Sequence, residues 1–276
     1  MFTSDWPGRE GHIEFGANKI YYVEDGEGPP IVFIHGGAVD HRMWAPQLER
    51  FRHTNRVIAY DTRAHGRSEL VEDETDDLED LVAVLDVFAE SRAQIVGLSF
   101  GAAIALDFAL ALPERVSRLV LMSPGLVGVQ EQDPSHREPI EAIGRALAAD
   151  DVDGALRVIE RMTFEGRREN RVEGLDEARA YVDSVVRDHI ARDRHTRLPR
   201  LRDFEPAKRL GEIACPTLIV YGAEDLPYVV RNARILAGGI EDDILMEIQG
   251  GGHLVNVERA EEVNAALEAF LEGREG

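Results

Sequence analysis

Short apolar runs alternate with longer amphipathic stretches over the first half of the chain. The apolar runs are rich in Val, Ile and Leu and predict buried strands over residues 31–34, 56–61, 93–97 and 118–123. The stretches between them repeat apolar residues at the helical period and predict helices over residues 41–51, 76–91 and 100–112. Fully apolar strands that alternate with helices are typical of a parallel sheet covered on both faces. The pattern therefore predicts an α/β fold with a mostly parallel, doubly wound sheet.

The N-terminal segment departs from this alternation. Residues 11–28 alternate β-forming and polar residues around Gly16, Ala17 and Asn18, and these three residue types favour a tight turn. The segment therefore predicts an antiparallel hairpin ahead of the parallel strands.

A second departure begins after Pro124. Residues 126–206 contain no apolar strand, and their amphipathic stretches have the helical period. The first pattern then returns, with expected strands over 216–222 and 244–250 and a last helix over 260–273. We therefore expect a core made of residues 1–125 and 207–276, and an all-helical lid inserted between them over residues 126–206.

The stretch "QIVGLSFGAA" places Ser99 between Gly97 and Gly101, where a predicted strand gives way to a predicted helix. Such an abrupt turn forces its central residue into a strained conformation, and glycines two residues before and after it leave the space that the turn needs. The hydroxyl of Ser99 is then pushed out at the carboxyl edge of the sheet, which is where ligands bind in open α/β sheets.

A serine hydroxyl is a poor nucleophile on its own and needs a base, which a third group must orient. Among the histidines after Ser99, His253 follows the last strand in "QGGGHLVN", so it reaches the same edge of the sheet. The orienting acid is expected after the strand over 216–222, where Asp225 is favoured over its neighbour Glu224. The other histidines after Ser99 lie in the insertion and are interpreted as solvated: His136, His189 and His195.

Composition narrows the classes of function. Asp and Glu number 52 against 31 Lys and Arg, and the resulting charge of −21 repels phosphate backbones and anionic lipids, so neither nucleic acid nor membranes are expected as partners. Cys215 is the single cysteine, and no Cys/His cluster has metal-ligand spacing, so we expect no disulfide, no metal and no other cofactor. The polar N-terminus and the lack of a long apolar segment predict a soluble, cytoplasmic protein.

The order Ser, Asp, His, together with "GLSFG", "HGG" and the helical insertion after "LMSPG", resembles the α/β-hydrolase superfamily. "HGGAVDHRMWAPQLERF", "YDTRAHGRSE" and "GGGHLVNVERAEEVNAALEAFL" are similar to its lidded esterase, lactonase and perhydrolase-like members. The resemblance implies that Ser99 is the nucleophile, His253 the general base and Asp225 the group that orients it.

The same resemblance implies an oxyanion hole formed by the backbone N–H groups of Phe100 and Gly37, with Ala38 as the alternative to Gly37. One departure from the family pattern is Ala64, which stands where most members have a glycine. This departure concerns the backbone of that loop and leaves the triad intact.

A serine at the elbow favours acyl chemistry through a covalent acyl-enzyme. We expect the substrate to be a small ester or lactone, and the sequence leaves the oligomeric state open. Carbon–carbon bond hydrolysis and cofactor-free perhydrolysis use the same three residues and remain alternatives. A ligand receptor of low turnover is the alternative from a different class of protein.

Several other residues draw attention. His35 in "HGG" is expected to be structural, Trp44 to pack in the core or wall the substrate pocket, and Asp61 and Arg63 to form a pair that braces their loop. The arginines of the insertion form the one basic region of an acidic chain and indicate either a solvated helix face or a gate for a carboxylated substrate: Arg167, Arg168, Arg171 and the arginines of "HIARDRHTRLPR".

Overall fold

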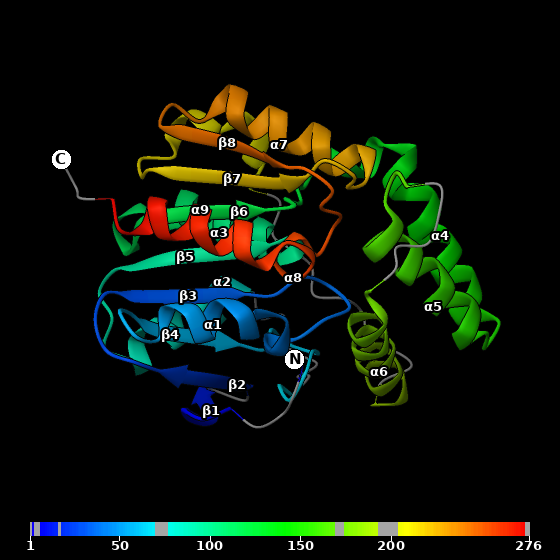
Figure 1. Cartoon of the computed structure of the whole chain (residues 1–276), viewed down its shortest axis with the longest axis horizontal. Helices are drawn as coiled ribbons and strands as arrows, with labels where there is room; N and C mark the ends of the chain where they lie inside the picture. Colours follow the sequence, from blue (N-terminus) through cyan, green and yellow to red (C-terminus); the bar gives the residue numbers. More distant parts are fainter. Residues whose placement is uncertain are drawn as a thin grey trace.

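The computed structural model describes residues 2, 6–15, 18–69, 77–168, 174–192 and 204–273. The strands of these residues form one sheet in the order β1-β2-β4-β3-β5-β6-β7-β8 (Figure 1). Their bounds are β1 Arg9–Phe15, β2 Asn18–Asp25, β3 Pro30–Ile34, β4 Arg56–Tyr60, β5 Ala93–Leu98, β6 Val116–Met122, β7 Thr217–Gly222 and β8 Asp243–Ile248. β2 runs antiparallel to β1 and β4, and all the other neighbouring pairs are parallel.

This topology confirms the predicted mostly parallel sheet and its N-terminal hairpin. The turn residues Gly16 and Ala17 lie outside the described residues, and Asn18 already pairs with Phe15 as the first residue of β2. β3 to β8 all run in the same direction, so the chain crosses back after each of them to begin the next strand at the same end. The carboxyl ends of β3 to β8 therefore share one edge of the sheet. Loops at that edge are brought together although they are far apart in sequence.

Helices cover both faces of the sheet (Figure 1). The α-helices are α1 Ala45–Phe51, α2 Asp77–Val87, α3 Phe100–Ala111, α4 Pro134–Ala148, α5 Val152–Glu160, α6 Asp176–Arg192, α7 Pro227–Gly239, α8 Val255–Glu258 and α9 Ala260–Leu271. A π-helical turn spans Arg161–Glu165, and short 3-10 helices span His41–Trp44, Pro113–Arg115, Gln130–Gln132, Pro206–Lys208 and Leu210–Glu212. Every described helix is too short or too polar to span a bilayer.

Two buried apolar clusters lie on the two faces of the sheet. β3 shows the alternation that strand geometry requires, since Val32 and Ile34 join one cluster and Ile31 and Phe33 join the other. The first cluster packs under α2, α3 and α7, and the second packs under α1 and α9. Trp44 belongs to the second cluster, fully buried with its ring centroid 5.2 Å from that of Phe33, which confirms the core interpretation.

Two helices differ from the sequence expectation. α2 ends at Val87 instead of residue 91, because the chain turns there and Ala89 takes a left-handed φ of 57°. α7 was not predicted, although its first residue, Pro227, is a residue type that favours helix starts.

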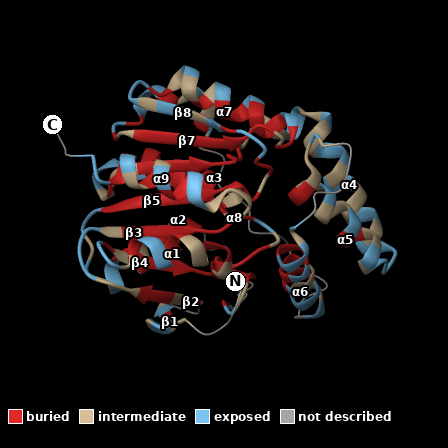
Figure 2. Cartoon of the chain, viewed as in Figure 1, coloured by how far each residue is buried: buried red, intermediate tan, exposed pale blue. Residues whose placement is uncertain are grey.

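The described residues between 126 and 206 are helical or irregular and contain no strand, in agreement with the predicted helical insertion. Its helices α4, α5 and α6 lie at one end of the sheet, apart from the helices on the two faces (Figure 1). Figure 2 shows that burial is uneven among them, because α4 carries no buried residue whereas α6 buries Tyr181 and Val182. That the segment acts as a lid, with these boundaries, stays a prediction.

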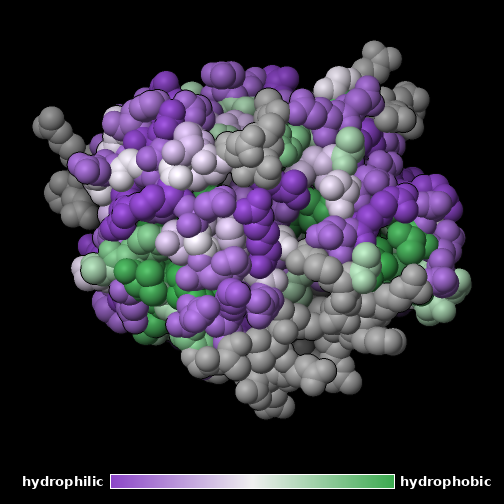
Figure 3. Space-filling model, turned by 90° about the horizontal axis from the view of Figure 1, so that it is seen from below, coloured by the Kyte–Doolittle hydropathy of each residue, from purple (hydrophilic) through white to green (hydrophobic). Residues whose placement is uncertain are grey.

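The surface is mostly hydrophilic and carries scattered apolar patches in the view of Figure 3. The large apolar side chains that the described residues expose are Val87, Ile140, Leu147, Ile244 and Leu245.

Candidate active site

The turn between β5 and α3 presents Ser99 at the carboxyl edge of the sheet. Ser99 has φ 55° and ψ −109°, a conformation that costs a non-glycine residue about 1–3 kcal/mol and persists only where its surroundings enforce it. A side chain at Gly97 would clash with the backbone of Gly101, and one at Gly101 would clash with the carbonyl of Ile34. The glycines therefore provide the close packing that the strained turn requires.

Three distant segments converge on this serine. His253, in the loop after β8, places its Nε2 3.0 Å from Ser99 Oγ and its Nδ1 2.9 Å from Asp225 Oδ1. Asp225 lies in the loop after β7, which is the neighbouring strand. The backbone N–H of the neighbouring Glu224 donates to Gly251 O, and among the described residues no hydrogen bond joins the Glu224 carboxylate to His253. The geometry thus separates the two carboxylates that the sequence left as alternatives.

The electrostatics of this trio suit a base that is held in one orientation. The side chain of Asp225 is fully buried and that of His253 is 13% exposed. Burial lowers the pKa of His253, but the charge and hydrogen bond of Asp225, with a smaller contribution from Glu258, outweigh burial, so the net pKa lies above the usual 6.5. With Nδ1–H donating to Asp225, Nε2 is left to accept a proton from Ser99.

The loop after β3 passes directly beside Ser99. A Cβ at Gly36 would lie 3.5 Å from Ser99 Cβ, an ordinary van der Waals contact, so the loop runs within contact distance of the serine. Phe100 opens α3, and the first N–H of a helix has no partner within the helix. Neither Phe100 N–H nor Gly37 N–H has a protein hydrogen-bond partner among the described residues, so both are available to an oxyanion. Ala38, the alternative to Gly37, takes a left-handed φ of 62°.

The insertion supplies contacts that the sequence did not indicate. His189 of α6 donates from Nδ1 to Ala64 O at 2.5 Å, and its ring stacks on His65 with centroids 5.5 Å apart. The interpretation of His189 as solvated is therefore wrong. His136 is half-buried against the ring of Tyr228, and His195 lies outside the described residues.

Arg167 and Arg168 lie in a turn instead of on a helix face. Arg167 is exposed, whereas the Arg168 side chain is 14% exposed and pairs with Glu258 at 3.0 Å. Arg168 also donates to Gly250 O at 2.6 Å, and Glu258 accepts from Gly252 N at 3.0 Å. The solvated interpretation is wrong for Arg168, which instead braces the loop before His253.

Arg171 lies outside the described residues, as does most of the "HIARDRHTRLPR" stretch. The gate for a carboxylated substrate therefore stays a prediction for those arginines.

The prediction that Asp61 and Arg63 pair with each other is wrong, because each has a different partner. Asp61 accepts from the N–H and the Nδ1 of His41 at 2.8 and 2.7 Å, while Arg63 forms a buried ion pair with Asp80. Ala64 adopts φ 63°, the conformation for which a glycine would be favoured. The alanine at this position therefore bears the backbone strain that a glycine would avoid.

His35 agrees with its expected structural role. Its Nδ1 lies 2.7 Å from Gly36 O, and its Nε2 accepts from Thr62 N at 2.9 Å, so both ring nitrogens hydrogen-bond to backbone groups of two different loops. Burial lowers its pKa, in keeping with a neutral ring.

Among the described residues, one group of side chains has metal-ligand proximity, namely Asp40, His41 and Asp61. Arg42 already pairs with the Asp40 carboxylate at 2.7 Å, and the Asp61 carboxylate accepts a hydrogen bond from His41 Nδ1. Because these oxygens are neutralised by protein donors, the donor set does not suit a cation.

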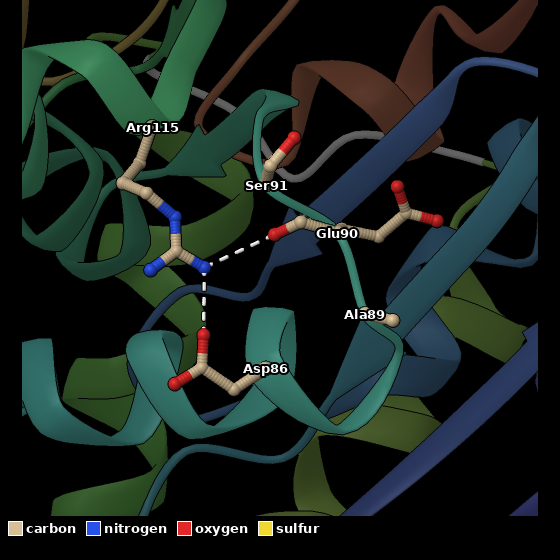
Figure 4. A pocket seen from close by; sticks show the side chains of 5 residues that line it. All are labelled: Asp86, Ala89, Glu90, Ser91 and Arg115. Atoms are coloured by element: carbon tan, nitrogen blue, oxygen red, sulfur yellow. Dashed lines mark hydrogen bonds and ion pairs between the residues drawn. The ribbon is translucent and has the colours of Figure 1, made fainter.

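A surface depression of about 440 Å³ lies beside the end of α2 (Figure 4). Arg115 points into it and donates to Asp86 and to the carbonyl of Glu90 at 2.8 and 3.0 Å, so its charge is already engaged. None of the residues that line it belongs to the Ser99 site.

Comparison with known proteins adds independent findings. The Alpha/beta hydrolase family matches residues 31–266. The 2-hydroxy-6-oxo-6-phenylhexa-2,4-dienoate hydrolase of Comamonas testosteroni is 29% identical, with 92% of each chain covered. The 3-oxoadipate enol-lactonase 1 of Acinetobacter baylyi is 26% identical, with 88% of each chain covered. The structure of Est816, described as an N-acyl homoserine lactone degrading enzyme, has a TM-score of 0.74 and 32% identity, covering 94% of this chain and all of that one.

Proposed function

The chain belongs to the α/β-hydrolase family and is a hydrolase, and from this premise we propose that it cleaves small esters or lactones through an acyl-enzyme on Ser99. The observation that carries the proposal is the chain of contacts from Ser99 Oγ through His253 to Asp225, at 3.0 and 2.9 Å. Such contacts activate a serine hydroxyl because the base is within hydrogen-bond reach and is itself oriented.

In the proposed reaction Ser99 Oγ attacks the carbonyl carbon of the substrate while His253 Nε2 takes the hydroxyl proton. The carbonyl electron pair moves onto oxygen, and the N–H groups of Phe100 and Gly37 donate to that oxyanion. Collapse of the tetrahedral intermediate breaks the carbon–oxygen bond, and the leaving alcohol takes the proton from His253. Water then attacks the acyl-serine with His253 as base, which releases the acid and restores the hydroxyl of Ser99.

Two observations support a neutral ester or lactone as the substrate. Est816, which resembles this chain at 32% identity over nearly its whole length, is described as degrading N-acyl homoserine lactones. Arg168, a cation of the insertion that lies beside the His253 loop, is neutralised by Glu258 and is not free to bind a substrate carboxylate.

Carbon–carbon bond hydrolysis is a second candidate, favoured by the 29% identity to the Comamonas dienoate hydrolase. A 2-hydroxy-6-oxo-dienoate carries a carboxylate as well as the ketone that is cleaved. Comparing kcat/KM for such a dienoate with that for neutral esters and lactones distinguishes the two, and faster cleavage of the dienoate would replace the first proposal.

The test of the proposal pairs a fluorophosphonate probe with turnover of 4-nitrophenyl butyrate and an N-acyl homoserine lactone. We expect wild-type protein to be labelled and to release many equivalents of product, and Ser99→Ala to do neither. A single equivalent of 4-nitrophenol per chain would indicate a receptor of low turnover, and labelling that persists in Ser99→Ala would remove Ser99 from the nucleophile role.

A further inference from the structure

The side chain of Tyr181, on α6 of the insertion, ends on the loop after β3. Its hydroxyl accepts from the backbone N–H of Asp40 at 2.9 Å and lies 2.9 Å from Asp40 Oδ1 and 3.1 Å from Asp40 O. A phenol has one proton to donate and can accept as well, so this single hydroxyl satisfies the backbone donor of Asp40 and one of its acceptors. Residues 141 positions apart are thereby joined at one atom.

The ring of Tyr181 is held as firmly as its hydroxyl. The residue is 5% exposed, the ring of Phe2 stacks on it with centroids 4.3 Å apart, and the Arg42 guanidinium lies 5.1 Å from its centroid. It belongs to the same buried cluster as Trp44, so α6 packs against the core of the sheet at this point. Burial and the nearby Asp40 charge keep the pKa of Tyr181 well above its usual value, so the hydroxyl keeps its proton.

The loop that Tyr181 contacts is strained in its middle and held at its ends. Gly36 and Gly37 have no side chains, and Ala38 is held in a left-handed conformation that costs a non-glycine residue free energy. His35 holds the carbonyl of Gly36, Val39 is buried in the second apolar cluster, and the Asp40 carboxylate caps the turn over His41–Trp44 by accepting from Arg42 N.

We propose that Tyr181 is a positioning residue for the oxyanion hole: through its hydrogen bonds to Asp40 it fixes the loop that offers the Gly37 or Ala38 N–H to the substrate oxygen. The insertion then helps to build the catalytic geometry as well as covering it. This inference rests on the proposed hydrolase function of the Ser99 site.

If Tyr181 positions the oxyanion hole, its loss should affect kcat and KM differently. An oxyanion donor stabilises charge that exists in the transition state and not in the bound ester, so a displaced donor lowers kcat while leaving KM almost unchanged. A transition-state analogue that places an oxygen in the hole, such as an alkyl boronic acid bonded to Ser99, must lose affinity by the same factor as kcat.

The test compares Tyr181→Phe with Tyr221→Phe. Tyr221 is a matched control because its hydroxyl also donates to a carboxylate, that of Glu247 at 2.6 Å, but on β7 and β8 away from the β3 loop. For 4-nitrophenyl butyrate we expect Tyr181→Phe to lower kcat about 10-fold or more, since a small misplacement of a catalytic group can cost up to about 100-fold. Its KM should stay within about two-fold, and butylboronic acid affinity should fall in step with kcat.

Three outcomes would overturn the inference: a kcat of Tyr181→Phe equal to that of Tyr221→Phe, a loss expressed in KM, or an unchanged boronic acid affinity. Asp40→Ser is the second variant in case Tyr181→Phe does not fold, because serine still caps the turn but loses the carboxylate contact to the phenol, while the contacts to the backbone N–H and O of residue 40 remain. It should lower kcat at constant KM by less than Tyr181→Phe does, and a wild-type kcat in it would count against the proposal. Absence of turnover in wild-type protein would contradict the proposed function instead.

Discussion

The first and last helices of the insertion meet the rest of the molecule in opposite ways. α4 buries no residue and exposes Ile140 and Leu147. α6 buries Tyr181, Val182 and Val185 in the cluster that runs under α1 and α9. Although both helices are amphipathic parts of one insertion, only the second is built into the core.

The difference extends to the loops at the carboxyl edge of the sheet. We call residues 161–168 and 174–192 the inner segment. It hydrogen-bonds to the β3 loop through Tyr181, to the β4 loop through His189, and to the β8 loop through Arg168. One insertion therefore contains both a helix without buried residues and a segment that is built into the core and hydrogen-bonds to the loops.

This comparison assumes that the chemistry resides in the loops that the inner segment braces. His253→Ala tests the assumption and carries the largest expected effect, a fall in kcat of about 10⁴-fold or more, because members of a triad act as a unit. The variant also leaves the fully buried Asp225 carboxylate without this partner, so the melting temperature should fall somewhat while the protein stays folded at the assay temperature. Ester turnover and a thermal melt measure both quantities, and a near-normal rate would remove His253 from the role of base.

The next largest effect is expected at the ion pair between Arg168 of the inner segment and Glu258, which we call the Glu258 anchor. Arg168→Met leaves the Glu258 carboxylate, 3% exposed, without its cation. Breaking a fully buried pair costs about 3–5 kcal/mol, and partial exposure of Arg168 reduces this to about 2 kcal/mol of unfolding free energy. Urea unfolding measures it. Adding Glu258→Gln removes the orphaned charge and should restore part of the loss.

Arg187→Met is the matched control for this anchor. Arg187 also lies in the inner segment and pairs with Asp183 and Asp153, but its side chain is 48% exposed. Pairs that are so exposed contribute about 0–1 kcal/mol. Equal losses of stability for Arg168→Met and Arg187→Met would mean that the Glu258 anchor is no stronger than a surface ion pair.

Glu258 also affects the pH dependence of activity, because its charge contributes to the raised pKa of His253. His253 must be neutral to accept a proton, and its pKa lies above 6.5 because Asp225 and Glu258 favour the charged ring. We therefore expect kcat/KM to fall as the pH decreases through a value above 6.5. Glu258→Gln removes one of these negative charges and should move the acid limb to lower pH, with Asp225 still in place. The measurement uses the same ester. If the acid limb of the pH profile does not move, Glu258 braces the loop without changing the pKa of the His253 imidazole.

Sequence patterns were sufficient to predict the sheet and the convergence of three loops at its carboxyl edge, and the reason is physical. Buried strands of α/β proteins are apolar on both faces, and the carboxyl ends of parallel strands meet at one edge, so Ser99, Asp225 and His253 could be placed together before any coordinates. The turn at Ser99 was also foreseeable, because glycine spacing reports local backbone strain.

The inner segment was not foreseeable in the same way. Helical periodicity predicts that α6 has a buried face but not which loop it contacts, so it indicates no role for Tyr181 and does not indicate the contact of His189 with Ala64 O. Arg168 was grouped with a basic surface because its partner, Glu258, lies 90 residues away. Contacts between an insertion and distant loops depend on how segments far apart in the sequence pack together, and a local pattern contains no information about that packing.

The smallest expected effect belongs to α4 and completes the comparison. Ile140 and Leu147 are 44% and 41% exposed, so replacing each by serine removes little buried apolar area, and surface substitutions usually change stability by less than about 0.5 kcal/mol. kcat and KM for 4-nitrophenyl butyrate should also stay within about two-fold. A KM that rises for longer acyl chains alone would mean that α4 forms a wall for the acyl group, and the distinction between α4 and the inner segment would then fail.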